Sequence, residues 1–145
     1  MMTRFLRVWL CVSFFVLSVG CQRLPPHPEG MPELTPCTVV VTFGSEKIEG
    51  VGILLQPKNK KESNWSAGGQ TDAEGKAVMK TAAYYQGVVP GEYTISFQKS
   101  EPDEEMGPGI PLIPVKYFSA HSQEIIVVTK EQKEYVFELE GLSSN

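Results

Sequence analysis

Apolar and polar residues alternate in a series of short segments along this chain. In residues 92–98, Tyr93, Ile95 and Phe97 alternate with polar side chains. Successive side chains of a β-strand point to opposite faces, so this alternation predicts a strand with one buried face. Similar segments, rich in β-branched, aromatic or alternating apolar residues, predict further strands at residues 38–43, 51–56, 76–81, 125–129 and 135–139. Residues 65–71 show a weaker pattern of this kind.

Residues typical of turns separate these segments. Residues 44–47 and 90–91 predict reversals of the chain, and Gly75 supplies the positive φ that a tight turn at residues 72–75 requires. We expect residues 125–129 and 135–139 to pair as a hairpin, and the proline-containing residues 110–117 to form at best an edge strand. Short strands with frequent turns and no long apolar stripe at helical spacing predict an all-β sandwich or barrel.

A different pattern precedes the first predicted strand. Arg4 and Arg7 are followed by an almost unbroken apolar run at residues 8–19, and Gly20 stands directly before Cys21. A positive start, a short apolar run and a small residue at the cleavage position are typical of a secretory signal. The run is about a dozen residues long, whereas a spanning helix needs about 20.

The end of this signal resembles the lipobox of bacterial lipoproteins. In that family the cysteine thiol receives a diacylglycerol, the signal is cut before the cysteine, and the new amino terminus receives an acyl chain such as palmitate. Gly20 and Cys21 would then flank the cleavage site, and Cys21 would be lipidated. Ser18 stands where the family usually has leucine, and the alternative is an ordinary signal that is cut elsewhere. Gln22 after the cysteine favours the outer membrane over the inner membrane.

These features divide the chain into four parts. We expect a lipoprotein signal peptide at residues 1–20, a lipidated proline-rich tether at 21–36, a β-domain at 37–141 and a tail at 142–145. The five prolines in residues 22–36 predict an extended, semi-rigid tether, which would hold the domain about 3 Å per residue away from the lipid. The remaining domain is of ordinary size for one hydrophobic core.

Charge and cysteine content narrow the function. The chain has 13 basic and 17 acidic residues, and two of the basic ones leave with the signal. The resulting net charge of about −6 argues against nucleic acid and against electrostatic capture by anionic lipid. Cys11 leaves with the signal and Cys21 would be acylated, so Cys37 has no partner for an intrachain disulfide. Cys37 is expected to be a small buried hydrophobe, the alternative being a reactive thiol.

Five short motifs occur in order at residues 41–43 (Val-Thr-Phe), 48–57, 71–76 (Thr-Asp-Ala-Glu-Gly-Lys), 89–95 (Val-Pro-Gly-Glu-Tyr-Thr-Ile) and 113–117. Together they resemble the carboxypeptidase regulatory-like, or transthyretin-like, domains, over about residues 37–140. More narrowly, the chain is similar to the small lipoproteins of this type found in planctomycete bacteria. The resemblance implies a seven-stranded Greek-key β-sandwich of the prealbumin type. The chain departs from the family at residues 44–45, where an Asp-Gly turn is usual, and at Ala77 and Met79, where larger apolar residues are common.

The sequence offers no recognisable catalytic set. After the signal, the only histidines are His27 in the tether and His121 in a predicted loop, whereas a zinc carboxypeptidase site needs two histidines and a glutamate. There is also no P-loop or Gly-x-Gly-x-x-Gly. One domain histidine does not complete a Ser-His-Asp triad. The transthyretin-like hydroxyisourate hydrolases use a cluster of His and Arg that this domain lacks. We therefore expect no enzyme, cofactor or metal site, and read the acidic residues 101–105 as a solvated loop rather than a Ca²⁺ site.

Aromatic residues in predicted loops are the candidates for ligand binding. Tyr84 and Tyr85, together with Trp65, would form a platform for a sugar or peptide. The alternative is that one tyrosine ring packs in the fold and the other is a surface residue.

These observations predict a non-enzymatic, lipid-anchored β-sandwich of the bacterial cell envelope, with its domain in the periplasm or on the surface. Its role would be structural or binding. The expected partners are the membrane, through the lipid anchor, and an envelope protein or glycan, but no nucleic acid. The alternatives are a carbohydrate- or peptide-binding module that uses the exposed aromatics, and an accessory subunit of an envelope enzyme.

Overall fold

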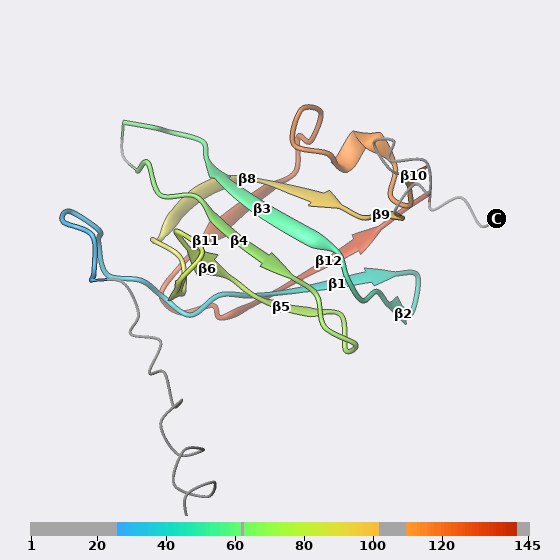
Figure 1. Cartoon of the computed structure of the whole chain (residues 1–145), viewed down its shortest axis with the longest axis horizontal. Coiled ribbons are helices and arrows are strands. Elements are labelled where there is room, and N and C mark those ends of the chain that lie inside the picture. Colours follow the sequence, from blue (N-terminus) through green and yellow to red (C-terminus); the bar gives the residue numbers. More distant parts are fainter. Residues whose placement is uncertain (1–25, 62, 102–109, 142–145) are drawn as a thin grey trace, which may run out of the picture.

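The computed structural model describes residues 26–61, 63–101 and 110–141 (Figure 1). Within these ranges the chain is all β apart from one short 3₁₀ helix, η1 (Val115–Tyr117). No helix in the described ranges is long and apolar enough to cross a membrane. The predicted signal peptide (1–20), the lipidation site at Cys21 and the tail (142–145) lie outside the described residues.

The first sheet is built around β1 (Thr38–Phe43). Along one edge of β1 runs β12 (Glu134–Leu139), which is parallel to it and places Tyr135 opposite Val39. The other edge pairs antiparallel with β5 (Lys76–Val78) over the first half of β1 and with β2 (Glu46–Lys47) at its end. This sheet therefore joins segments from the two ends of the domain.

The second sheet holds most of the remaining strands. Its order is β11 (Ile125–Val128), β8 (Gly91–Gln98), β3 (Gly52–Pro57), β4 (Ala67–Gln70), β6 (Lys80–Thr81) and β7 (Tyr85–Gln86). Each neighbouring pair of strands is antiparallel. A separate short pair, β9 (Ser100–Glu101) and β10 (Ile110–Pro111), follows β8 in the chain.

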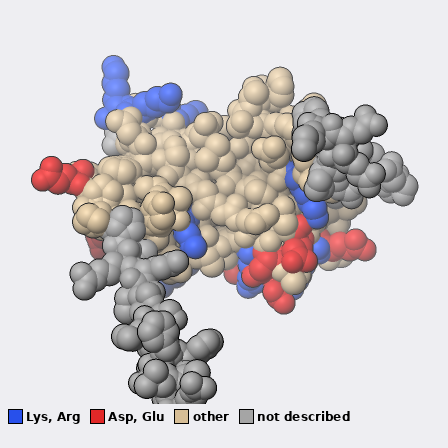
Figure 2. All heavy atoms as spheres, viewed as in Figure 1, with Lys and Arg blue, Asp and Glu red and all other residues tan. Residues whose placement is uncertain are grey.

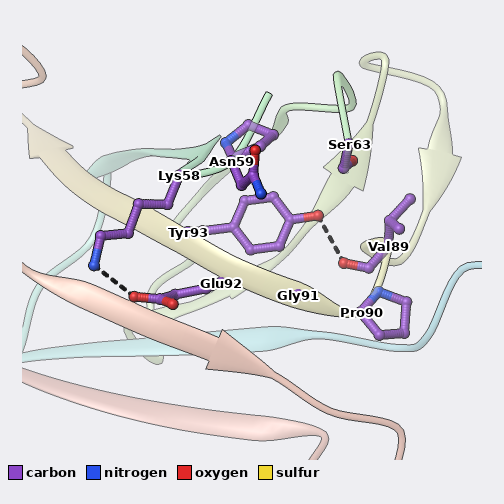
Figure 3. Close-up of a pocket in the computed structure, with 9 residues that line it drawn as sticks. Lys58, Asn59, Ser63, Val89, Pro90, Gly91, Glu92 and Tyr93 are labelled. Atoms are coloured by element: carbon purple, nitrogen blue, oxygen red, sulfur yellow. Dashed lines mark hydrogen bonds and ion pairs between the residues drawn. The ribbon is translucent and has the colours of Figure 1, made fainter. Parts of the chain in front are cut away.

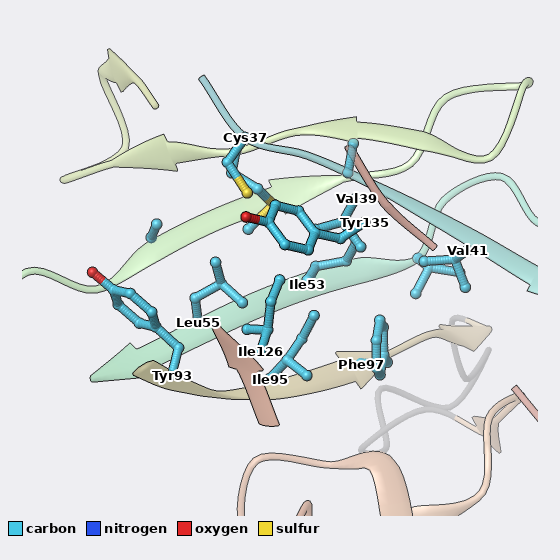
Figure 4. Packing of buried hydrophobic residues seen from close by; sticks show 14 of the residues in the cluster. Cys37, Val39, Val41, Ile53, Leu55, Tyr93, Ile95, Phe97, Ile126 and Tyr135 are labelled. Carbon is cyan, nitrogen blue, oxygen red and sulfur yellow. The ribbon is translucent and has the colours of Figure 1, made fainter. Parts of the chain in front are cut away.

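Side chains from both sheets meet in one hydrophobic cluster, so the arrangement is that of a sandwich that is not closed into a barrel (Figure 4). The alternation predicted for residues 92–98 is confirmed, because Tyr93, Ile95 and Phe97 are each at most 1% exposed. Cys37 is buried, as expected from its position beside the first strand. Ala77 and Met79, smaller than the residues usual in the resembled family, are also fully buried.

Residues 76–81 form one stretch of chain that belongs to both sheets. Its first part, β5, pairs with β1, and its last part, β6, pairs with β4 of the other sheet. The change takes place at Met79, whose N–H donates to Cys37 O at 2.9 Å and whose carbonyl accepts from Gly87 N at 2.9 Å. The predicted strand at 76–81 is therefore present, but it is divided between the two layers.

The hairpin predicted for residues 125–139 is wrong. β11 pairs with β8 in one sheet, whereas β12 pairs with β1 in the other, so the intervening loop crosses between the layers. Both strands have the expected alternation, with Ile126, Val128 and Tyr135 buried. Alternation fixes which face of a strand is buried, but it does not name the neighbouring strand.

The turn predicted at residues 72–75 is confirmed. A single carboxylate oxygen of Asp72 accepts hydrogen bonds from the N–H groups of Glu74 (3.0 Å) and Lys76 (2.9 Å). Gly75 has φ +71°, and a Cβ at this position would lie 2.8 Å from Val41 O. Glycine is therefore required both by the left-handed backbone and by its contact with β1.

Two neighbouring leucines of β3 test the layered arrangement. Leu55 is fully buried, whereas Leu54, on the opposite face, is 36% exposed. We expect Leu55→Ala to lower the free energy of unfolding by about 2–5 kcal/mol, because it leaves a cavity in a packed core. Leu54→Ala is the matched control and should cost much less. Urea unfolding followed by circular dichroism measures both, and equal losses would contradict the assignment of the two faces.

Candidate functional site

The three aromatic residues predicted for ligand binding lie in different environments. Tyr84 is 58% exposed and follows a turn in which Ala82 and Ala83 adopt positive φ values of 50° and 66°. Trp65 is half-buried in the loop between β3 and β4, where its backbone N–H donates to Ser63 Oγ at 3.2 Å. The register between Ala67 and Thr81 brings this loop and the turn before Tyr84 to the same end of the sheet.

Tyr85 is engaged by the segment that precedes the first strand. Its hydroxyl donates to Pro26 O at 2.7 Å, and its ring lies 5.3 Å from the His27 ring, centroid to centroid. Tyr85 therefore binds the chain's own tether rather than standing free beside Tyr84.

A polar groove lies on the outer face of the second sheet. Gln56 and Thr94 are opposite one another on β3 and β8, and their neighbours Leu55 and Ile95 are buried in the core. Alternation along the two strands therefore directs Gln56 and Thr94 outward. Together with loop residues they line a hollow of about 560 Å³. Its lining residues are Gln56, Pro57, Lys58, Lys60, Asn64, Ser66, Thr94, Ser119 and Ser122.

The wall of the groove on the side of β11 is held by hydrogen bonds to the sheet. Ser122 Oγ donates to Ile95 O at 2.5 Å, and Ile95 N donates to Glu124 O at 3.0 Å. These bonds tie the loop that carries Ser119 and Ser122 to the edge of β8. The opposite wall comes from the β3–β4 loop, in which Asn64 and Ser66 flank Trp65.

A smaller hollow of about 250 Å³ adjoins the groove and shares Pro57 and Lys58 with it (Figure 3). At its rim Lys58 Nζ lies 2.6 Å from a carboxylate oxygen of Glu92. The Tyr93 hydroxyl donates to Val89 O at 2.6 Å, and burial raises the pKa of this hydroxyl above its usual value. Because Tyr93 is 1% exposed and its hydroxyl is bonded to the backbone, it supports the hollow rather than acting on a ligand.

Apart from Pro57, the described residues that line the groove carry hydroxyl, amide and ammonium groups. Hydroxyl and amide side chains offer both donors and acceptors of hydrogen bonds. Lysine ammonium groups pair with carboxylate or phosphate. Lys58 and Lys60 both line the groove, and the ammonium group of Lys58 is already paired with Glu92. Neither histidine nor carboxylate is among the described lining residues. The arrangement is suited to holding an acidic, hydroxyl-rich molecule.

Neither Cys37 nor His121 lines the groove, although His121 belongs to the same loop as the lining residues Ser119 and Ser122. Cys37 is 2% exposed, and burial raises the pKa of its thiol from 9.0 to about 11. His121 is exposed in the loop after η1, where its backbone N–H donates to Phe118 O at 2.8 Å. Among the described residues no group of three or more His, Cys, Asp or Glu is placed to hold a metal ion.

Comparison with protein-family models, curated proteins and solved structures found no match to this chain. The argument for a site therefore depends on the groove itself. From the sequence, residues 58–62 are predicted to form a solvated loop, and the groove is not predicted. A usable signal was the placement of polar residues at Gln56 and Thr94, the outward positions of two adjacent strands.

Cys37 offers a test by chemical modification. In the Cys21→Ala protein expressed without residues 1–20, the single thiol should not react with a disulfide reagent at pH 8, because it is buried and protonated. Unfolding in urea should expose one reactive thiol per chain. Fast reaction of the folded protein would show instead that Cys37 is accessible.

The same thiol predicts a pH dependence of stability. The folded pKa of about 11 lies above the unfolded value of 9.0, so the contribution of Cys37 to stability is full below pH 9 and is lost as the pH rises towards 11. The protein with Cys37 should therefore lose stability more steeply over this window than Cys37→Ala. Urea unfolding at several pH values measures the difference, and parallel curves would contradict the raised pKa.

Proposed function

We propose that this protein is a non-enzymatic, lipid-anchored binding module of the bacterial cell envelope, and that its groove takes an acidic oligosaccharide. The observation behind this choice of ligand is the lining of the groove, in which Lys60, and Lys58 with its partner Glu92, stand beside amide and hydroxyl side chains. Sugar hydroxyls match the amides and hydroxyls, and a sugar carboxylate or phosphate matches the ammonium groups.

The aromatic residues have unequal parts in this proposal. Trp65 lies between the lining residues Asn64 and Ser66 but does not itself line the groove, so it is not assigned to the ligand. Tyr85 is occupied by Pro26 and His27 and is not assigned to the ligand. Tyr84 lies on a neighbouring turn and is given a different role below.

We also propose that the domain is a seven-stranded Greek-key sandwich of the carboxypeptidase regulatory-like type. Two observations support this assignment. The principal strands form one layer in the order β5-β1-β12 and another in the order β4-β3-β8-β11. The first and last strands, β1 and β12, are parallel neighbours, which requires the chain to return across the sandwich. β2, β6, β7, β9 and β10 are then short additions to this arrangement.

The anchor is proposed from the sequence of the signal, and it is tested by removing the lipidated thiol. In a bacterial host, the full chain should be recovered with the membranes, with acyl mass on a mature chain that begins at Cys21. Cys21→Ala should lack the acyl mass and leave the membrane fraction. Membrane fractionation and intact mass spectrometry make the comparison. A soluble wild-type protein that is cut elsewhere would overturn the anchor.

Lys60→Glu tests the groove. We expect reversal of this charge to weaken binding of a uronic-acid oligosaccharide about tenfold or more, because hydrogen bonds to charged groups contribute about 1.5–3 kcal/mol. Lys80→Glu is the matched control, since Lys80 is exposed on β6 and does not line the groove. Titration calorimetry on the detergent-purified protein measures both, with a neutral oligosaccharide as a second ligand. Equal losses in the two variants, or no preference for the acidic sugar, would contradict the assignment.

A further inference from the structure

We infer that the end of the sandwich at which the tether docks faces the membrane at short range, with Tyr84 and Trp65 at the bilayer surface. We call this the tether end, and it comprises residues 26–36, the loop 58–66, the turn 82–84 and the loop 129–133. The inference rests on the lipid anchor of the proposed function. It adds an interaction surface and an orientation that the anchor alone does not require.

The described part of the tether is bound to the domain at several points. The Tyr85 hydroxyl donates to Pro26 O at 2.7 Å, and the rings of Tyr85 and His27 lie 5.3 Å apart. Thr35 and Val88 exchange two backbone hydrogen bonds of 2.9 Å each, and Thr35 is buried. These contacts make residues 26–35 a part of the folded domain rather than a free spacer.

The docked segment limits how far the domain lies from the anchor. Cys21 and Pro26 are five residues apart, and an extended chain spans at most about 3.6 Å per residue. Pro26 therefore lies within about 18 Å of an anchored Cys21. If residues 26–35 were released, the reach from Cys21 to Thr35 would be about 50 Å.

The strand register brings aromatic loops to this same end. Pro57 at the end of β3 is opposite Tyr93, Ala67 at the start of β4 is opposite Thr81, and both neighbouring loops open beside the tether (Figure 1). Tyr84 is 58% exposed next to Tyr85, and Trp65 is half-buried in the loop. Tyrosine and tryptophan are enriched at membrane–water interfaces because each has an apolar ring with a polar group.

The charges favour the same orientation. Lysines of the loop after β3 gather at the tether end, whereas acidic side chains, with some lysines among them, gather at the opposite end, around β2 and the turn 72–75 (Figure 2). At the tether end, Glu92 and Glu33 are each paired with a lysine, at 2.6 and 3.1 Å, and Glu29 and Glu131 are exposed. The acidic domain does not bind an anionic surface by charge alone, but once it is anchored the acidic end is directed away from anionic headgroups.

The test measures which end of the domain is near the bilayer. The lipidated full chain is reconstituted in vesicles of phosphatidylethanolamine and phosphatidylglycerol, with a fluorophore on Tyr84→Cys or on Glu74→Cys and a headgroup spin-labelled lipid as quencher. Both positions are exposed, and they lie at opposite ends of strands that span about 20 Å. We expect several-fold stronger quenching at position 84. Equal quenching, or stronger quenching at position 74, would overturn the inference.

A second variant tests whether the docked tether sets the distance. In the Tyr84→Cys background, Tyr85→Ala removes the contacts with Pro26 and His27, so quenching should fall towards the level at position 74. Gln86→Ala, an exposed neighbour, is the matched control and should leave quenching unchanged. Unchanged quenching in a folded Tyr85→Ala protein would contradict the role of docking. The protein without an added cysteine controls for labelling of the buried Cys37.

Flotation of the vesicles distinguishes failure of the lipid anchor from failure of the inferred orientation. A protein that does not float and carries no acyl mass overturns the anchor, and the inference with it. A protein that floats but is quenched equally at both positions retains the anchor and overturns only the orientation.

Discussion

The crossing of the chain between the two sheets at Met79 is the constraint on which the rest of the structure depends. Met79 is fully buried, and its backbone is bonded to Cys37 on one side and to Gly87 on the other. Because the chain leaves one sheet and joins the other here, the turn at 82–84 is placed at one end of the sandwich. Gly87 then comes so close to the tether that a Cβ would lie 2.7 Å from Thr35 O, which only glycine permits. The docked tether is thus a consequence of how the two layers are joined.

The groove depends equally on the core. Along β3 and β8, burial of Leu55 and Ile95 fixes Gln56 and Thr94 on the outer face, and a slip of one residue in either strand would exchange the two sets. The polar face is therefore specified by the apolar one. Hydrogen bonds from Ser122 and to Glu124 then hold the wall of the groove on the backbone of Ile95, so the site is positioned by the main chain of a buried strand.

Features that depend on neighbouring residues were predictable from the sequence. The buried alternation of Tyr93, Ile95 and Phe97, the turn closed by Asp72 and the burial of Cys37 all follow from local pattern. The strand that pairs with β12 could not be predicted in this way, because β1 lies far away in the sequence and the nearby β11 suggested a hairpin. The Tyr135 hydroxyl, which accepts from Thr129 N at 3.0 Å and donates to Gln132 O at 3.1 Å, closes that connection instead. The groove was missed because its residues come from three separate segments.

The docked tether changes what the proposed lipid anchor would do for this domain. A free, proline-rich tether would let the domain sample a hemisphere of about 50 Å radius in any orientation. With residues 26–35 bound to the domain, a lipid anchor at Cys21 would reach only about 18 Å and would hold the tether end towards the surface. Effective concentration rises steeply as the reach of a linker shortens, provided that the linker still spans the two sites. The groove borders the loop 58–66 at this same end, so it would meet a ligand at the bilayer surface at a far higher effective concentration than one in free solution.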